Sequence, residues 1–326
     1  MRRRKFVSVL GCAAVWPLVG NAQQVEKPKK IGILAQESEA TFTKAWRSFV
    51  EGLRDHGWIE GKNIEFERRF ANGVRERLAE LAAELVRLNV DVILTVGSVP
   101  PIYAKQATSS IPIIFTASGD PVATGLVASL AKPGGNVTGV ATQVSTELGT
   151  KRLQLLKEAI PGLARVSVLW EANESNVRMF KSIEVAAASL AIKLYSVQML
   201  KPADVDTALE ALAQQLPDGL LIFGTPLTFF HGQQIVNFAA NNRLPAMYSS
   251  RDFVDVGGLM SYGPGFSYLL RRAAEYVDKM LKGVRPNELP VEQPIKFYLV
   301  INLKAARAQG IAIAQSVLAQ ADELIE

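Results

Sequence analysis

Short apolar runs alternate with amphipathic stretches along most of this chain. The run Ile31-Gly32-Ile33-Leu34-Ala35 ends at the polar Gln36, which is typical of a buried parallel strand. Between Phe42 and Leu53 the apolar positions recur at spacings of three and four, which predicts a helix that ends before Gly57. The same patterns predict further strands at 63–70, 91–96 and 112–117 and a helix at 75–88. Alternating strands and helices predict an α/β fold built on a doubly wound parallel sheet.

The segment Lys132-Pro133-Gly134-Gly135-Asn136 interrupts this alternation, and we predict that the chain crosses there into a second domain. Beyond it, the pattern predicts helices at 147–159, 176–190, 203–214, 227–241 and 266–281, and strands at 165–170, 192–197, 219–223, 245–248, 259–262 and 297–301. A second α/β sheet therefore follows the first. The length agrees with two domains, because roughly 300 residues are more than one hydrophobic core usually holds.

The N-terminus has the three parts of an export signal: a basic start, an apolar stretch and small residues before Gln23. Gly20-Asn21-Ala22 predicts cleavage after Ala22, so that residues 1–22 form a signal peptide. Arg3-Arg4-Lys5 fits the bacterial twin-arginine pattern, and the predicted localisation is periplasmic. The apolar stretch is shorter than the ~20 residues that span a membrane. Val9-Leu10-Gly11-Cys12 resembles a lipoprotein cleavage box, which leaves lipidation at Cys12 as the alternative.

The predicted signal peptide also carries most of the net charge. The formal net charge is +5, and Arg2, Arg3, Arg4 and Lys5 contribute four positive charges before the first acidic residue, so the mature net charge is 5 − 4 = +1. This near-neutral balance argues against nucleic acid or anionic lipid as a partner. Cys12 is the only cysteine, so the mature chain has neither a disulfide nor a cysteine metal ligand.

Polar residues that directly follow the apolar strands are the candidates for ligand binding, since open parallel sheets bind ligands beyond the carboxyl ends of their strands. Gly97 and Ser98 precede two prolines, where free backbone N–H groups of a helix start suit a carboxylate. Asp120 can hold a ligand ammonium or cap the next helix, and both interpretations stay open. The predicted ligand-binding residues are Gln36, Gly97, Ser98, Ser118, Asp120, Asn173, Thr225, Tyr248 and Tyr262.

Several of these residues have a structural alternative. Asn173 belongs to a polar run that helix capping also explains, and Thr225 lies in a strand-glycine-hydroxyl-proline arrangement that a packing turn also explains. Trp170, Tyr248 and Tyr262 lie near strand ends, where they either stack on a ligand ring or anchor the core.

Signals for catalysis are weak. The mature chain has two histidines, His56 and His231, far apart and without a recognisable nucleophile. The sequence contains no Gly-x-Ser-x-Gly elbow, no Walker loop, no dinucleotide-binding glycine motif after the first strand and no His-Glu-x-x-His zinc motif. We therefore expect a protein that is not an enzyme and that uses neither a cofactor nor a metal.

A set of motifs is spread over the whole mature chain: Ile31-Gly32-Ile33-Leu34, Gly52-Leu53-Arg54-Asp55-His56-Gly57-Trp58 with Glu60-Gly61-Lys62-Asn63, Pro112-Ile113-Ile114-Phe115 with Asp120-Pro121, Pro133-Gly134-Gly135-Asn136-Val137-Thr138-Gly139, and Ile301-Asn302-Leu303-Lys304-Ala305-Ala306. Together they resemble the type I periplasmic binding proteins, and among these the ABC transporter substrate-binding family with tryptophan- and tyrosine-binding members. Gly97-Ser98-Val99-Pro100-Pro101 and Thr225-Pro226-Leu227 depart from the turns common in the members that bind aromatic amino acids, which indicates an altered pocket.

The resemblance implies two Rossmann-like lobes joined by a hinge. Lobe 1 is expected to comprise residues 28–140 plus about 258–288, and lobe 2 residues 141–257 plus about 289–326. The implied function is that of the extracytoplasmic solute-binding component of an ABC importer, which takes a small amino-acid-like or carboxylate ligand and delivers it to an ABC permease in the inner membrane. We expect a monomer. The alternatives are an extracytoplasmic sensor for a signalling partner and, less favoured, an α/β enzyme.

Overall fold

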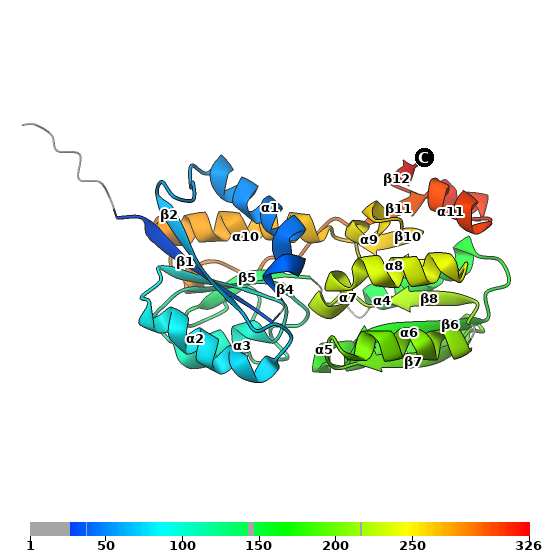
Figure 1. The fold of residues 1–326 in the computed structure, drawn as a ribbon, viewed down its shortest axis with the longest axis horizontal. Helices are drawn as coiled ribbons and strands as arrows, with labels where there is room; N and C mark the ends of the chain where they lie inside the picture. The colour runs from blue at the N-terminus through cyan, green and yellow to red at the C-terminus, as the bar shows by residue number, and fades with distance from the viewer. Residues whose placement is uncertain (1–26, 37, 143–146, 216) are drawn as a thin grey trace, which may run out of the picture.

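Two α/β lobes lie side by side along the long axis of the molecule (Figure 1). The computed structural model describes residues 27–326 except 37, 143–146 and 216. The predicted signal peptide, its cleavage after Ala22 and the alternative at Cys12 lie outside the described residues. In the part of the chain that is described, no helix is both long and apolar enough to cross a membrane.

The first lobe is built on a five-stranded parallel sheet in the order β2-β1-β3-β4-β5. Its strands are β1 (Lys29–Ala35), β2 (Ile64–Phe70), β3 (Val92–Val96), β4 (Ile113–Ser118) and β5 (Val137–Ala141). Its helices are α1 (Glu39–Asp55), α2 (Leu78–Arg87) after the 3-10 turn η1 (Arg75–Arg77), α3 (Pro100–Ala107) and α10 (Phe266–Leu281). The predicted strands at 31–35, 63–70, 91–96 and 112–117 are confirmed within about one or two residues at each end.

Strand β1 is apolar on both faces because helices cover both sides of this sheet. Ile31 and Ile33 pack in a core cluster with α1 and α10, whereas Leu34 packs in a second cluster with α2 and α3. Figure 1 shows α10 running alongside α1, although more than 200 residues separate the two helices in the sequence.

The second lobe is built on a seven-stranded sheet in the order β12-β11-β10-β9-β8-β6-β7, parallel except between β10 and β11. Its strands are β6 (Arg165–Glu171), β7 (Lys193–Met199), β8 (Gly219–Ile222), β9 (Ala246–Tyr248), β10 (Met260–Gly263), β11 (Tyr298–Asn302) and β12 (Glu323–Ile325). Its helices are α4 (Glu147–Ala159), α5 (Glu174–Ser189), α6 (Asp204–Gln215), α7 (Pro226–Phe230), α8 (Gly232–Asn241), α9 (Arg251–Asp255), α11 (Leu303–Gln309) and α12 (Gln315–Leu318). One core cluster gathers α4, α5, α11 and α12, and the other gathers α6, α8 and α9.

The chain passes between the lobes three times. It first leaves the first lobe after β5, then returns between β10 and α10, so the return falls at residues 264–265 rather than at about 258. After the 3-10 turn η2 (Pro286–Glu288), the chain still runs along β5, because Val291 N donates to Leu130 O at 2.7 Å and Ala141 N donates to Glu292 O at 2.9 Å. It reaches the second lobe again only at β11. These three connecting segments form the hinge region between the lobes.

The predicted crossing at 132–136 is wrong. This segment leads instead into β5, the fifth strand of the first sheet, and the side-chain amide of Asn136 donates to Thr108 O at 3.0 Å and to Ile111 O at 2.8 Å. The predicted helix at 227–241 is divided at His231 into α7 and α8. The short elements α9, α11, α12 and β12 were not predicted, because three to seven residues show too little periodicity.

We expect Gly139→Ala to destabilise the first lobe. Gly139 pairs with Phe115 on β4, and a Cβ atom at this position would overlap the Phe115 carbonyl oxygen. Overpacking of this kind costs about 1–3 kcal/mol and lowers the unfolding temperature by roughly 2–12 °C. Gly265→Ala is the control, because a Cβ atom there meets nothing closer than 4.0 Å. Equal unfolding temperatures for the two variants in thermal denaturation would contradict the close approach of Gly139 to the Phe115 backbone.

Candidate functional site

A cleft lined by residues of both lobes lies where the carboxyl ends of the two sheets meet. It has two compartments with open volumes of about 550 Å³ and 460 Å³, which share Ala117, Thr142, Gly224 and Thr225 and are therefore continuous. We call them the apolar compartment and the polar compartment after their other lining residues.

The polar compartment is lined by the loops that follow β1, β3, β4, β6 and β8. Gly97 has a φ of +86°, a conformation that glycine adopts without strain, and this turn places Ser98 at the cleft. The Ser98 hydroxyl accepts a hydrogen bond from Gly119 N at 3.0 Å and so joins the loops after β3 and β4. Two strand ends of the first lobe are thereby held together at the cleft.

On the second lobe, Asn173 and Thr225 cap helices and also line the cleft. The Asn173 side chain accepts from Asn176 N at 3.0 Å at the start of α5, and the Thr225 hydroxyl accepts from Thr228 N at 3.2 Å at the start of α7. The capping interpretation therefore holds for Asn173, and Thr225, for which a packing turn was the alternative, caps a helix as well. Contact of these two side chains with a ligand is a separate role and stays a proposal.

Glu171 is the acidic residue of the polar compartment, and we did not predict it as a site residue. It ends β6 and lines the cleft. Burial raises the pKa of the Glu171 carboxyl, while a hydrogen bond with the Thr225 side chain and the charge of Arg75 act in the opposite direction. A carboxylate at this position is a ready partner for a cationic group in the cleft.

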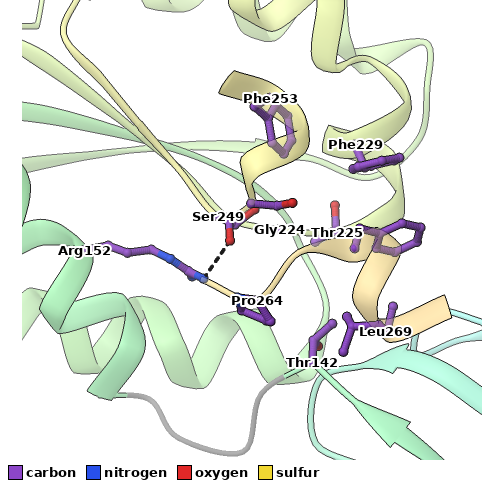
Figure 2. A pocket seen from close by; sticks show the side chains of 12 residues that line it. Thr142, Arg152, Gly224, Thr225, Phe229, Ser249, Phe253, Pro264 and Leu269 are labelled. Atoms are coloured by element: carbon purple, nitrogen blue, oxygen red, sulfur yellow. Dashed lines mark hydrogen bonds between the residues drawn. The ribbon is translucent and has the colours of Figure 1, made fainter. Parts of the chain in front are cut away.

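Aromatic rings from both lobes wall the apolar compartment (Figure 2). Phe229 of α7 stacks on Phe266 of α10 with ring centroids 4.5 Å apart, and it meets Phe253 of α9 edge-on at 6.0 Å. Leu269 adds an aliphatic contact from α10. Because Phe266 belongs to the first lobe and Phe229 to the second, this wall is complete only when the lobes lie together.

Arg152 brings a positive charge to the apolar compartment. Figure 2 shows its side chain extending from α4 towards Ser249, beside Pro264. Its Nε donates to Tyr262 O at 2.6 Å and its Nη2 donates to Ser249 O at 3.2 Å. Arg152 is only 3 % exposed, and burial lowers its pKa to about 10, so the guanidinium remains charged at neutral pH. No carboxylate among the described residues forms a salt bridge with it.

Five of the nine predicted ligand-binding residues line the cleft: Gln36, Gly97, Ser98, Asn173 and Thr225. Four do not line either compartment: Ser118, Asp120, Tyr248 and Tyr262. Side chains alternate across a strand, so a residue at a strand end can point into the core instead of the cleft.

The aromatic residues show this alternation. Tyr248 is buried in the core and stacks on Phe253 with ring centroids 5.1 Å apart, and burial raises its phenol pKa. Tyr262 packs beside Phe297 at 6.2 Å, and its carbonyl oxygen, not its ring, meets Arg152. Trp170 stacks on Phe180 and donates from Nε1 to the Ser196 hydroxyl at 2.9 Å. All three are core anchors.

The two remaining residues lie next to the cleft. Ser118 is fully buried, and its hydroxyl has no hydrogen-bond partner among the described residues. Asp120 begins a turn by accepting from Ala123 N at 3.0 Å, and no helix follows it before β5. Of its two interpretations, the helix cap is therefore wrong, and contact with a ligand stays a prediction. Its other carboxylate oxygen lies 3.3 Å from Nη2 of Arg178 on α5.

Among the described residues, this ion pair and two close approaches join the lobes at the rim of the cleft. A Cβ atom on Gly119 would lie 2.6 Å from the Ser175 hydroxyl, and one on Gly73 would lie 2.8 Å from Pro202. Asp120, Gly119 and Gly73 follow strands of the first sheet, whereas Arg178, Ser175 and Pro202 belong to the second lobe. The lobes therefore touch across the cleft.

We expect Asp120→Asn to weaken ligand binding by no more than about fivefold. The two side chains are 25 % and 36 % exposed, and such a pair is worth about 0.2–1 kcal/mol. Arg178→Gln is expected to have the same effect, and both effects shrink at high salt in calorimetric titrations. If Asp120→Asn weakens binding more than tenfold while Arg178→Gln changes nothing, Asp120 contacts the ligand directly.

The histidines lie in other surroundings. His56 is 3.7 Å from Asp278, and His231 is 3.3 Å from Gln234. Within the described ranges no cluster of three His, Cys, Asp or Glu side chains suits a metal ion.

Three segments join the two α/β lobes, and the strand ends of both sheets line the cleft that the lobes share. This architecture is that of a two-lobed solute-binding protein. The chain belongs to the ABC transporter substrate binding protein family, whose model matches residues 30–325. The members of this family bind small molecules and work with ABC permeases, and this fits the resemblance expected from the sequence motifs.

Individual relatives agree with this assignment. A tyrosine-binding protein of Clostridioides difficile (strain R20291) is 28 % identical over 303 residues, which cover 91 % of this chain and 86 % of the relative. A conserved domain protein from Vibrio cholerae superimposes with a TM-score of 0.82 at 28 % identity, over 91 % of this chain and all of that chain. An ABC domain from Streptococcus pneumonia in complex with L-Trp has the same fold, with a TM-score of 0.81 at 22 % identity, over 92 % and 100 % of the two chains. A ligand-free, open substrate binding protein from Clostridium difficile gives a TM-score of 0.62 at 24 % identity, over 91 % and 99 %.

Proposed function

We propose that this chain is the exported solute-binding protein of an ABC importer and that it binds an amino acid or a related carboxylate between its lobes. The observation that carries the ligand class is Glu171, a partly buried carboxylate in the cleft. No Lys, Arg or His nitrogen of the described residues lies within 4.0 Å of it. A ligand ammonium would place a positive charge in direct contact with the carboxylate, whose charge Arg75 and the Thr225 side chain stabilise only in part.

The relatives support an amino acid, since one is a tyrosine-binding protein and another was solved with L-Trp. Ser98 and Asn173 add polar groups on opposite sides of the compartment, so that a ligand there would be held by both lobes. We propose that the N-terminal segment directs the chain to the periplasm by the twin-arginine route and that the mature protein is a monomer.

We further propose that the lobes close around the ligand. The rim contacts and the Phe229–Phe266 stack describe a closed arrangement. The closer superposition on the L-Trp complex than on the ligand-free, open structure supports this view. A ligand that touches both lobes favours the closed population because it binds that population more tightly.

A thermal-shift screen tests the proposal. The mature chain would be screened with the twenty amino acids, small aliphatic carboxylates and aromatic acids. A ligand at 100 times its dissociation constant adds about 2.7 kcal/mol of stability, which raises the unfolding temperature by roughly 5–11 °C. The proposal fails if no amino acid shifts the unfolding temperature, or if the compound that does so is consumed rather than released intact.

A further inference from the structure

We infer that Arg152 binds the carboxylate of the ligand in the apolar compartment, so that the acid group is recognised beside the hinge and not at the helix N-termini of the polar compartment. This inference rests on the proposed function, because it concerns the same cleft. It differs from the expectation drawn from the sequence, which placed the carboxylate at the turn of Gly97 and Ser98.

The first argument is the unbalanced charge of Arg152. A guanidinium has five N–H donors, and two of them meet the carbonyl oxygens of Tyr262 and Ser249. The other three have no partner among the described residues. A buried cation is stable only when an anion or further acceptors surround it, and neither carbonyl neutralises its charge. A bound carboxylate would do so through the paired geometry that guanidinium groups favour.

The second argument is the position of the group. The side chain lies against the cleft and is held on both sides, because Tyr262 belongs to β10 and Ser249 follows β9. Two hydrogen bonds restrict the orientation of the guanidinium before any ligand arrives. A preorganised group loses less conformational entropy on binding than a free side chain does.

The third argument is the apolar surface of the compartment that Arg152 lines. Phe229, Phe253 and Phe266 surround the same compartment with apolar area, and this suits the apolar body of an acid. With Glu171 in the adjoining compartment, the cleft holds a buried positive charge and a partly buried negative one. The ligand class that fits is therefore an acid with an apolar, preferably aromatic, body and an ammonium group.

Matched ligands test this assignment. Binding of L-phenylalanine, 3-phenylpropionate and phenethylamine, and of L-tryptophan, indole-3-propionate and tryptamine, would be measured by calorimetry on the mature chain. The wild type is expected to bind each amino acid at least tenfold more tightly than the amine that lacks its carboxylate. Arg152→Met is expected to remove this difference while leaving the affinity for the amines within about twofold. Arg152→Lys keeps a positive charge but loses the paired N–H donors of the guanidinium. Its preference for the amino acid over the amine is expected to lie between those of the wild type and Arg152→Met.

Three results would overturn the inference. The first is that the wild type binds each amino acid no more tightly than the amine that lacks its carboxylate. The second is that Arg152→Met weakens the binding of every ligand by the same factor. The third is that Arg152→Met still binds the amino acids at least tenfold more tightly than the amines. If Arg152→Met does not fold, as shown by circular dichroism, the comparison rests on Arg152→Lys, whose discrimination must then fall below that of the wild type.

The two proposals fail differently. If no amino acid binds but 3-phenylpropionate or indole-3-propionate binds in a manner that depends on Arg152, the amino-acid function is wrong and the inference on Arg152 stands. If neither the amino acids nor these acids bind, the inference is overturned together with the ligand class.

Discussion

Glu171→Gln is expected to weaken the binding of an amino acid by at least tenfold and, at the same time, to stabilise the ligand-free protein at neutral pH. The variant keeps the size of the side chain and its ability to accept a hydrogen bond, but it removes the negative charge that would pair with an ammonium. Loss of one partner from a desolvated charge pair costs about 2–5 kcal/mol of binding. Removal of a partly buried charge without a salt-bridge partner lowers the cost of folding.

The expected pH dependence follows from the raised pKa of Glu171. Because this pKa is higher in the folded protein than in the unfolded chain, protonation stabilises the fold. That stabilisation is complete below the ordinary glutamate pKa and is lost as the pH rises through the raised one. The neutral acid cannot pair with an ammonium, so affinity should fall as the pH is lowered through the raised pKa. Both pH effects should be absent in Glu171→Gln.

Glu184→Gln is the matched control, since Glu184 is an exposed glutamate on α5, outside the cleft lining. It should change neither the affinity nor the unfolding temperature beyond about 0.5 kcal/mol. Calorimetric titrations and thermal denaturation between pH 4 and 8 provide the measurements. Unchanged affinity in Glu171→Gln, or an equal loss in the control, would remove the main physical support for an ammonium-bearing ligand.

Long elements with a strong hydrophobic pattern were predictable, because a strand that is buried on both faces requires a continuous run of apolar residues. The run at 31–35 is buried throughout β1, and the loop residues Gly97, Ser98, Asn173 and Thr225 line the cleft because parallel strands of one sheet end on one side. The five residues of β5 were missed, since a short run with a glycine beside a Pro-Gly-Gly turn resembles a loop.

The charged site residues escaped prediction for a different reason. Arg152 lies on the same helical face as Leu148, Leu155 and Leu156, and that position on an apolar stripe was a usable signal. Its meaning depends on Tyr262, 110 residues away, which no local pattern reveals. Glu171 stood within a predicted polar loop, yet its burial arises from tertiary packing around the strand end.

The closure of the lobes can be trapped covalently, and we expect the variant with Gly119→Cys and Ser175→Cys to lock it. A Cβ atom on Gly119 would lie 3.2 Å from the Ser175 Cβ, and a disulfide needs about 3.8 Å, so a small rotation of the lobes is sufficient. The only natural cysteine is Cys12, so a chain that begins at residue 23 contains no competing thiol. The engineered pair therefore reports on this contact alone.

After oxidation, the ligand-free double variant should scatter X-rays like the ligand-loaded wild type, whereas the ligand-free wild type should have the larger radius of gyration. A ligand bound before oxidation should leave at least about tenfold more slowly than from the reduced protein, because release requires the lobes to separate. Reduction should restore both properties, and each single cysteine variant should behave like the reduced form. If the ligand-free wild type already scatters like the locked form, or if the disulfide leaves the release rate unchanged, the lobes do not open and close around the ligand.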